Sequence, residues 1–192
     1  TEALDYRRMS QEVSQGHVDG VPHLARAVAD ALTASTDRLR DVVGPCAGND
    51  RVDDDDACLE AWVRDFGERA FRRPLSEAEV ALYTDPIDPS ATSAADRVRV
   101  ATTAMLMAPP FYYQLELGGE PVPGVPDTYA LAPYELASRL ALTFWRSVPD
   151  AALLEAARSG ALADPDAYRA EVERLLADPR AERAVDRLVE DW

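Results

Sequence analysis

The sequence has no lysine, because all 20 of its basic residues are arginine. This absence excludes Schiff-base chemistry and the lysine of a phosphate-binding loop.

Histidine is nearly absent as well. His17 and His23 lie six positions apart across a glycine, so they cannot share one helix face as metal ligands do. We expect both histidines on the surface or in loops. Serines are plentiful, but none lies in a nucleophile-elbow pattern, so the residues do not support hydrolytic catalysis.

Cysteine is equally scarce. Only Cys46 and Cys58 occur, with eleven residues between them and no histidine nearby to complete a zinc site. The spacing favours a disulfide, which would stabilise the fold by about 3 kcal/mol in the chain-entropy model. A disulfide would place the protein outside the cytosol, and two separately buried thiols are the alternative. Because Cys-x-x-Cys-His is also missing, this chain cannot attach a c-type haem covalently.

Positive charge is in deficit, with 35 acidic residues and a net charge of -15. Nucleic acid and anionic membranes would be repelled, so cationic or neutral partners are favoured.

Long apolar runs are also missing. The longest, residues 100–113, contains polar residues and Pro109-Pro110, so we expect neither a membrane span nor a signal peptide. A hydrophobic content of 47% is nevertheless enough to bury a core.

What the sequence does contain is helical periodicity, interrupted by proline and glycine. We expect an all-α fold, an irregular multi-helix bundle in two helical subdomains. The first subdomain covers 1–117, a Pro/Gly linker covers 118–131, and the second starts at 132 and runs to 192. Apolar residues keep helical spacing up to Trp192, so we expect the second subdomain to be truncated. We expect helices at 4–13 and 22–43, a third that follows the aspartate run and ends at 73, and a fourth that starts at 76. Further helices are expected at 93–107, 132–145, 149–157, 165–177 and 180–192.

Several helix boundaries have specific signals. The Gly16–Gly20 region is expected to break the chain, with Pro22 in the first turn of the next helix. Ser76 followed by Glu79 forms the capping-box pattern. Four aspartates, Asp53, Asp54, Asp55 and Asp56, precede an apolar helical stripe, where they suit the positive end of the helix dipole. The same run is a weak calcium candidate, although it lacks the glycine and distal glutamate of the helix-loop-helix pattern.

Arginines beside aromatics are the remaining candidates for a site. Arg72, Arg73 and Arg139 could bind an anionic ligand or a partner bidentately. In so acidic a chain we expect Arg72 and Arg73 to pair with an internal carboxylate such as Glu68 or Glu77.

A second expectation concerns aromatic side chains. We expect Arg139 and Arg146 to brace the neighbouring Trp145 by packing on its ring. Phe111, Tyr112 and Tyr113 could line a ligand groove, but burial between the two subdomains is the default expectation.

Five short stretches of the sequence, taken in order, resemble a known family. The phrases are Phe66-Gly-Glu-Arg-Ala-Phe-Arg-Arg-Pro-Leu75, Ala108-Pro-Pro-Phe-Tyr-Tyr-Gln-Leu-Glu116, Ser138-Arg-Leu140, Phe144-Trp145 with Pro149-Asp150, and Leu175-Leu-Ala-Asp-Pro-Arg180. The family is the pair of domains of unknown function numbered fifteen-ninety-five and fifteen-ninety-two. They are found in large secreted planctomycete and myxobacterial proteins, often beside cytochrome c modules.

The resemblance implies an extracytoplasmic helical module, periplasmic or secreted, with no established activity to carry onto these residues. We therefore expect an accessory or scaffold module of a larger, redox-linked protein. Its partners would be the rest of its own polypeptide or a second chain, and any haem would belong to a partner domain. The alternatives are an enzyme that binds an anionic substrate through arginines and is completed by further C-terminal residues, and a glycan-binding module.

Overall fold

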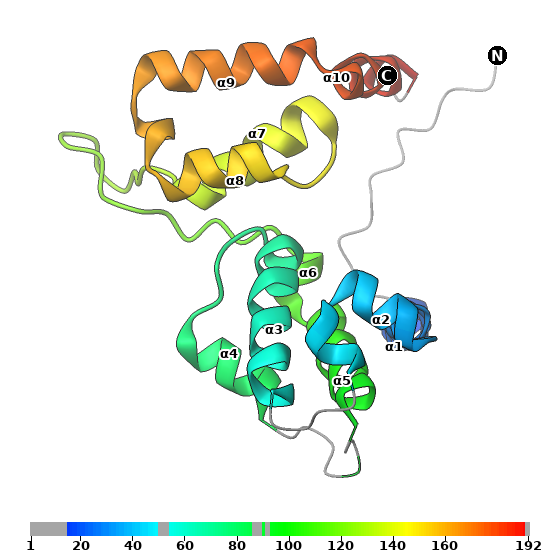
Figure 1. Ribbon diagram of the computed structural model, residues 1–192. Coiled ribbons are helices and arrows are strands. Elements are labelled where there is room, and N and C mark those ends of the chain that lie inside the picture. The colour runs from blue at the N-terminus through cyan, green and yellow to red at the C-terminus, as the bar shows by residue number, and fades with distance from the viewer. Residues whose placement is uncertain (1–14, 50–53, 86–89, 91–92, 191–192) are drawn as a thin grey trace. The chain divides into compact units, whose positions relative to one another are not determined.

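The computed structural model describes residues 15–49, 54–85, 90 and 93–190 (Figure 1). These residues form ten α-helices and two short 3-10 helices, and their only β-pairing is an isolated bridge between Pro121 and Tyr129. The all-α prediction is therefore confirmed. The helix expected at 4–13 lies outside the described residues. By its internal contacts the chain divides into an N-terminal unit within Glu12–Tyr113 and a C-terminal unit within Gln114–Trp192.

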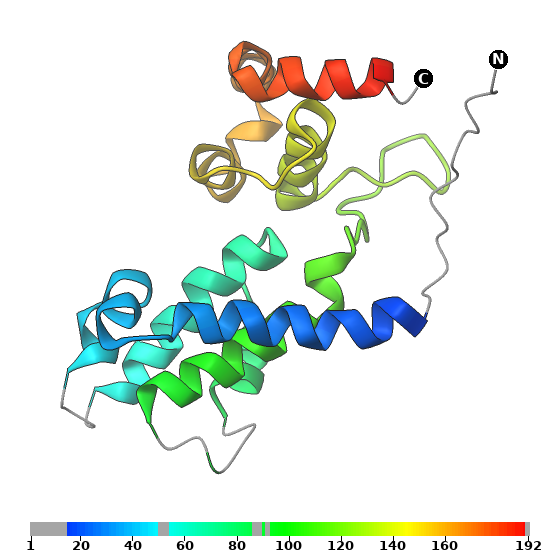
Figure 2. The ribbon, with the colours of Figure 1, turned by 90° about the vertical axis from the view of Figure 1, so that its right-hand side faces the viewer.

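The N-terminal unit consists of α1 (Gln15–Leu32), α2 (Thr36–Val42), the 3-10 helix η1 (Pro45–Gly48), α3 (Asp55–Phe71), α4 (Glu77–Thr84), α5 (Ala94–Met107) and α6 (Pro109–Tyr112). In Figure 2, α1 extends along α5. Small side chains on the buried face of α1, Ala25 and Ala29, allow this close approach.

The prediction for the start of this unit was wrong in two respects. First, α1 runs without interruption through Gly16, Gly20 and Pro22. We attribute this to the packing of α1 on α5, which outweighs the weak helix propensity of those residues. Second, the single helix expected over 22–43 is two helices, because Ser35 caps a new one by accepting a hydrogen bond from the Arg38 backbone N–H at 3.2 Å.

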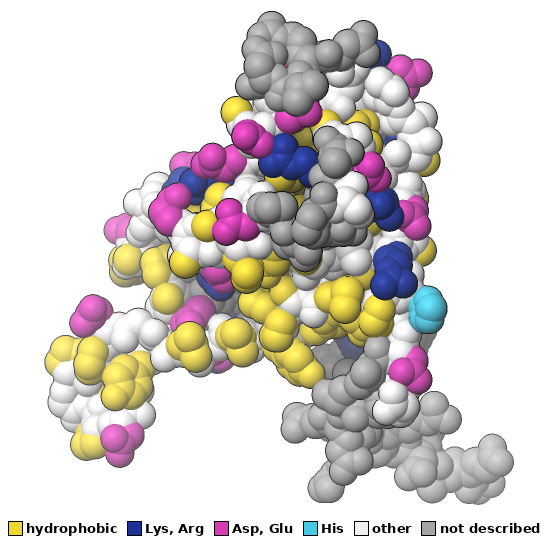
Figure 3. All heavy atoms as spheres, turned by 90° about the horizontal axis from the view of Figure 1, so that it is seen from below, with side chains coloured by type: hydrophobic (Ala, Val, Ile, Leu, Met, Phe, Trp, Pro, Cys, Tyr) yellow, Lys and Arg dark blue, Asp and Glu magenta, His cyan; other side chains and the backbone are white. Residues whose placement is uncertain are grey.

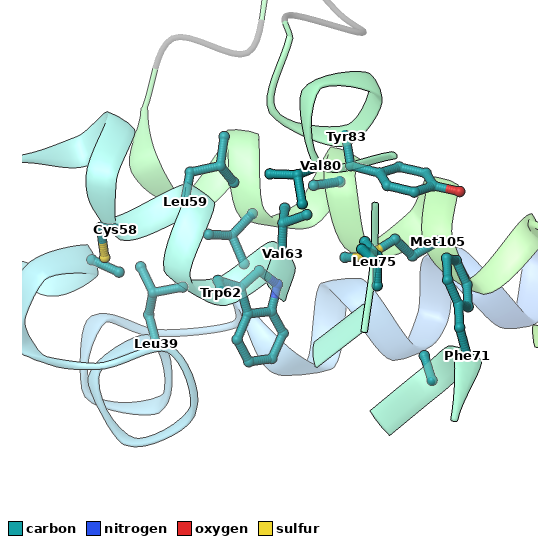
Figure 4. Packing of buried hydrophobic residues seen from close by; sticks show 14 residues of the cluster. Leu39, Cys58, Leu59, Trp62, Val63, Phe71, Leu75, Val80, Tyr83 and Met105 are labelled. Carbon is teal, nitrogen blue, oxygen red and sulfur yellow. The ribbon is translucent and has the colours of Figure 1, made fainter. Parts of the chain in front are cut away.

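The core of the N-terminal unit lies mainly between α3, α4 and α5 (Figure 4). Its central members include Trp62, Val63 and Met105, all 3% exposed or less. The Trp62 indole N–H donates to the hydroxyl of Thr102 at 3.0 Å, and Thr102 is fully buried. This satisfied polar pair fixes how α3 meets α5, since leaving either group unpaired would carry a desolvation cost.

The predicted disulfide is present. Cys46 in η1 bonds Cys58 in the first turns of α3, with 5.9 Å between their Cα atoms. Cys58 is buried in the core and Cys46 is half-buried beside it. The bond therefore joins the segment containing α2 and η1 covalently to the helix that forms the centre of the unit.

The C-terminal unit begins with an irregular ribbon and continues as a helical cluster. Its elements are α7 (Pro133–Trp145), α8 (Ala151–Arg158), the 3-10 helix η2 (Ala161–Ala163), α9 (Pro165–Ala177) and α10 (Pro179–Glu190). Its core is formed by Ala137, Leu140, Ala141, Trp145, Leu153, Ala157, Leu162, Leu175 and Ala181.

Capping residues explain why most of these helices start where the sequence predicts. Ser76 and Glu79 form the complete capping box of α4. Ser93 caps α5, Asp150 caps α8 and Asp164 caps α9, each by accepting backbone N–H groups of the first turn. Within the described residues, none of the helices is both long enough and apolar enough to cross a membrane.

Candidate functional site

Arg72 is at the corner where α3 ends. Its backbone adopts the left-handed conformation, with φ of 60° and ψ of 22°, which turns the chain out of the helix. The guanidinium donates hydrogen bonds to the carbonyls of Pro110 at 2.6 Å, Tyr113 at 2.9 Å, Ala70 at 3.2 Å and Phe111 at 3.3 Å. Burial lowers the pKa of Arg72. The side chain thus binds the carbonyls around α6 and joins the end of α3 to that segment.

Arg73 has a different role. It binds the carboxylate of Glu79 with two nitrogens, at 2.7 and 2.9 Å. The expectation of an internal carboxylate is confirmed for Arg73, but the carboxylate is that of Glu79 and not of Glu68 or Glu77, and Glu77 lies 2.7 Å from Arg64. The same expectation is wrong for Arg72, which binds backbone carbonyls. The same Glu79 carboxylate accepts the backbone N–H of Ser76 at 2.9 Å. The hydrogen bond from Arg73, helped by the bonds from Ser76, lowers the pKa of Glu79 to about 2.

In the C-terminal unit, Arg139 on α7 binds Glu116 with two nitrogens. This hydrogen-bonded pairing lowers the pKa of Glu116. One turn earlier on α7, Glu135 accepts the backbone N–H groups of Leu117 at 2.7 Å and Ala132 at 2.9 Å. Arg139 therefore helps to hold the segment that leads into the ribbon against α7.

Two arginines that the sequence did not single out pack on Trp145. Arg180 at the start of α10 has its Cζ 3.4 Å from the centroid of the ring, and Arg174 on α9 has its Cζ 5.5 Å away. The indole N–H donates to the Leu175 carbonyl at 3.0 Å. The expectation that Arg139 packs on Trp145 is wrong, since its guanidinium is engaged by Glu116.

Two aspartates complete the cluster around Trp145. Asp150 accepts two hydrogen bonds from Arg174, at 2.8 and 3.1 Å, and also caps α8. Burial raises the pKa of Asp150, but the bonds from Arg174 and from the Leu153 backbone outweigh it, so the net pKa is lowered. Asp178 is bound by the side chain and backbone N–H of Arg180, which lowers its pKa to about 2. Sequence reasoning missed this network, because Arg174 lies 24 positions from Asp150 and Arg180 lies 35 positions from Trp145.

The described aspartates at the start of α3 have separate surroundings and do not share one site. Asp53 lies outside the described residues. Asp54 accepts the Asn49 side-chain amide at 3.0 Å, Asp55 is buried in the first turn, and Asp56 lies 2.6 Å from Arg97. Across the described ranges, no group of three or more His, Cys, Asp or Glu residues is placed to hold a metal ion. Asp54 and Asp56 connect the start of α3 to Asn49 and Arg97, and Asp55 lies within its first turn.

An open hollow with a mixed polar and apolar lining lies beside α3. It has a volume of about 340 Å³ and is lined by Ala61, Arg64, Asp65, Glu68, Pro74 and Leu75. Arg64 inside it is already bound by Glu60 at 2.8 Å and by Glu77 at 2.7 Å. His23 is exposed on α1, and the side chain of His17 lies outside the description. The hollow therefore has no free cation and no histidine among its lining residues.

The aromatic segment after α5 is partly at the surface. Phe111 packs against the core, whereas Tyr112 is 43% exposed and Tyr113 is 51% exposed. The expectation that these residues are buried between the two subdomains stays a prediction. In Figure 3, acidic and arginine side chains are interspersed over one part of the face, whereas apolar side chains gather next to one another over another part.

Two family models match this chain. Residues 58–116 match the family described as PSD5: Protein of unknown function (DUF1595), and residues 131–192 match PSD4: Protein of unknown function (DUF1592). No curated protein and no solved structure matches it significantly.

The arginines described above join phrases that lie inside these two segments. In the first, Arg72 connects the phrase at 66–75 to the carbonyls at 110–113. In the second, Arg180 connects the phrase at 175–180 to Trp145. The chain thus carries the pair of domains of unknown function that its phrases resemble, DUF1595 followed by DUF1592.

Proposed function

We propose that this chain is an extracytoplasmic accessory or scaffold module of a larger protein and is not catalytic by itself. The observation that carries the proposal is that the three candidate arginines are bound by groups of their own unit. Arg72 is held by backbone carbonyls, Arg73 by Glu79 and Arg139 by Glu116. A side chain already bound within its own unit has few donors left for a ligand. These groups strengthen the joints between helices, as a scaffold requires.

The disulfide supports the location outside the cytosol. Bonds of this kind persist in oxidising compartments and are rare where glutathione keeps thiols reduced. The location is tested by trapping thiols in living cells with an alkylating reagent and then measuring the mass of the chain. We expect Cys46 and Cys58 to remain unalkylated. Alkylation of both without prior reduction would contradict the extracytoplasmic location.

The partner that we propose is a cytochrome c module, on the same polypeptide or on a second chain. This part rests on the family resemblance. The experiment is to isolate the full-length native protein from its source and record the visible absorption spectrum. We expect the Soret and α bands of a haem protein that co-purifies in constant ratio. A preparation with no haem band would overturn the redox part of the proposal. The scaffold role is tested by the anion titration described next.

An enzyme that binds an anionic substrate is the competing function. It is tested by titrating the protein with inorganic phosphate and with citrate, while following binding by calorimetry. A scaffold predicts no saturable binding. Saturable binding that is lost in Arg73→Gln or Arg139→Gln, but retained in Arg169→Gln on the exposed face of α9, would overturn the scaffold role.

The exposure of Tyr112 and Tyr113 favours a second candidate, a glycan-binding surface. The carbonyls on either side of Tyr112 are held by Arg72, so the backbone that presents the two rings is fixed. Such amphipathic rings suit a ligand with an apolar face and hydroxyl groups. Electrophoresis through gels containing soluble polysaccharides tests this function. Retardation that disappears in Tyr112→Ala/Tyr113→Ala, but persists in Tyr168→Ala, would support it.

A further inference from the structure

The part of the N-terminal unit that contains α2 and η1, residues 36–48, adds few fully buried side chains to the core, although Val42, Val43 and Cys46 pack against it half-buried. We call it the α2–η1 corner. Its α-helix has seven residues and contributes one buried side chain, Leu39. A helix of this length is not stable alone and depends on tertiary packing. The 3-10 helix adds the buried Ala47 and Gly48, and Gly48 packs against Arg40 of the same corner.

Much of the core lies away from the corner. Figure 4 shows Leu39 and Cys58 at one end of the cluster, with Phe71, Tyr83 and Met105 toward the other. The joints between α3, α4 and α5 are made by groups outside the corner, among them Trp62 with Thr102. Removing the corner would therefore leave most of the buried side chains of α3, α4 and α5 in contact with one another.

From this difference we propose that the Cys46–Cys58 disulfide is a redox-sensitive latch. When it is intact, it holds the α2–η1 corner against the start of α3. When it is reduced, the corner opens locally, while α3, α4 and α5 stay folded. Regions with few buried contacts open at lower free energy than the core, and a covalent tie is what prevents that here. The proposal does not depend on the scaffold role.

The chemistry needs only a dithiol reductant. Cys46 is the less buried of the two cysteines, so a thiolate of the reductant attacks its sulfur and Cys58 leaves as a thiolate that takes a proton. The second thiol of the reductant then releases Cys46. Two electrons and two protons pass from the dithiol to the protein, and the reductant becomes a cyclic disulfide. Opening would expose the apolar surface that Leu39 and Leu59 now share with the core.

The test is hydrogen exchange of the intact chain, followed by mass spectrometry, with and without dithiothreitol. We expect amides of residues 37–48 to exchange at least about tenfold faster after reduction, because closing a short loop is worth roughly two powers of ten in an opening equilibrium. Amides of α5 should keep their protection, and reoxidation should restore the original pattern.

A matched variant, Cys46→Ala/Cys58→Ala, provides the control. It should show the fast exchange without reductant and no further response to dithiothreitol. Faster exchange throughout the N-terminal unit after reduction would mean that the bond supports the whole unit, and would overturn the latch. Unchanged exchange after confirmed reduction would overturn it as well.

Discussion

The guanidinium of Arg180 lies over the indole of Trp145, with 3.4 Å between Cζ and the ring centroid. This contact joins the first turn of α10 to the end of α7. Arg180 also binds Asp178 at 2.7 Å, so its position is set from two directions. It is the clearest case in this molecule of a helix junction fixed by one arginine.

We predict that Arg180→Ala weakens the C-terminal unit. The substitution removes the cation–π contact and the ion pair with Asp178, both of which hold α10 in place. Urea unfolding should show a lower midpoint than wild type. Arg169→Ala, which removes an exposed arginine of α9, is the control and should leave the midpoint nearly unchanged. Equal midpoints for the two variants would show that the contact adds no stability.

A second prediction concerns two glycines inside helices. A Cβ at Gly67 would lie 2.5 Å from Cδ1 of the buried Leu75, whereas a Cβ at Gly20 would meet nothing within 4 Å. Gly67→Ala should therefore destabilise the fold by about 1–3 kcal/mol through overpacking. Gly20→Ala should stabilise it by roughly 0.5–1 kcal/mol through helix propensity. Thermal unfolding of both variants measures the difference, and shifts of the same sign would refute the packing argument.

A third prediction concerns the buried polar pair. Thr102→Val keeps the volume of the side chain but leaves the Trp62 N–H without its acceptor. We expect a loss of about 1–3 kcal/mol in the free energy of unfolding. Thr103→Val is the matched control, because that hydroxyl only bonds the Arg99 carbonyl of its own helix at 2.8 Å. Its loss should be about 0.5 kcal/mol or less.

A fourth prediction concerns acid. Glu79 has a folded-state pKa of about 2, lowered from 4.5 by Arg73. The folded state therefore binds this proton more weakly than the unfolded state does. The stabilisation is fully present above about pH 4.5 and is lost as the pH falls through 2. Urea unfolding measured from pH 6 to pH 2 should show a shallower loss of stability in Glu79→Gln than in wild type. The same slope in both would contradict the role assigned to this ion pair.

Local signals in the sequence predicted much of the fold. The starts of α4, α5 and α9 follow from Ser76, Ser93 and Asp164 with Pro165, since each cap needs only residues within one turn. The break between α1 and α2 was missed although Ser35 is such a cap. The continuity of α1 through Pro22 was missed for a different reason, because it depends on packing against α5, far away in the chain.

The candidate site was harder to predict for the same reason. The sequence drew attention to Arg72, Arg73 and Arg139, and all three have structural partners. It did not indicate which partner each would take. Glu79 lies two positions beyond Glu77, one of the two expected partners, and Arg180 contacts Trp145 across 35 positions of sequence. Such pairings are decided by how helices cross, which periodicity does not encode.

Glu79 has two roles at the start of α4. Its carboxylate closes the start of α4 by accepting from Ser76, and it neutralises Arg73. Glutamine would keep the reach but discard the charge, while aspartate would keep the charge but fall short of the backbone. Related chains that replace this residue should therefore replace Arg73 as well, so the two positions are expected to vary together.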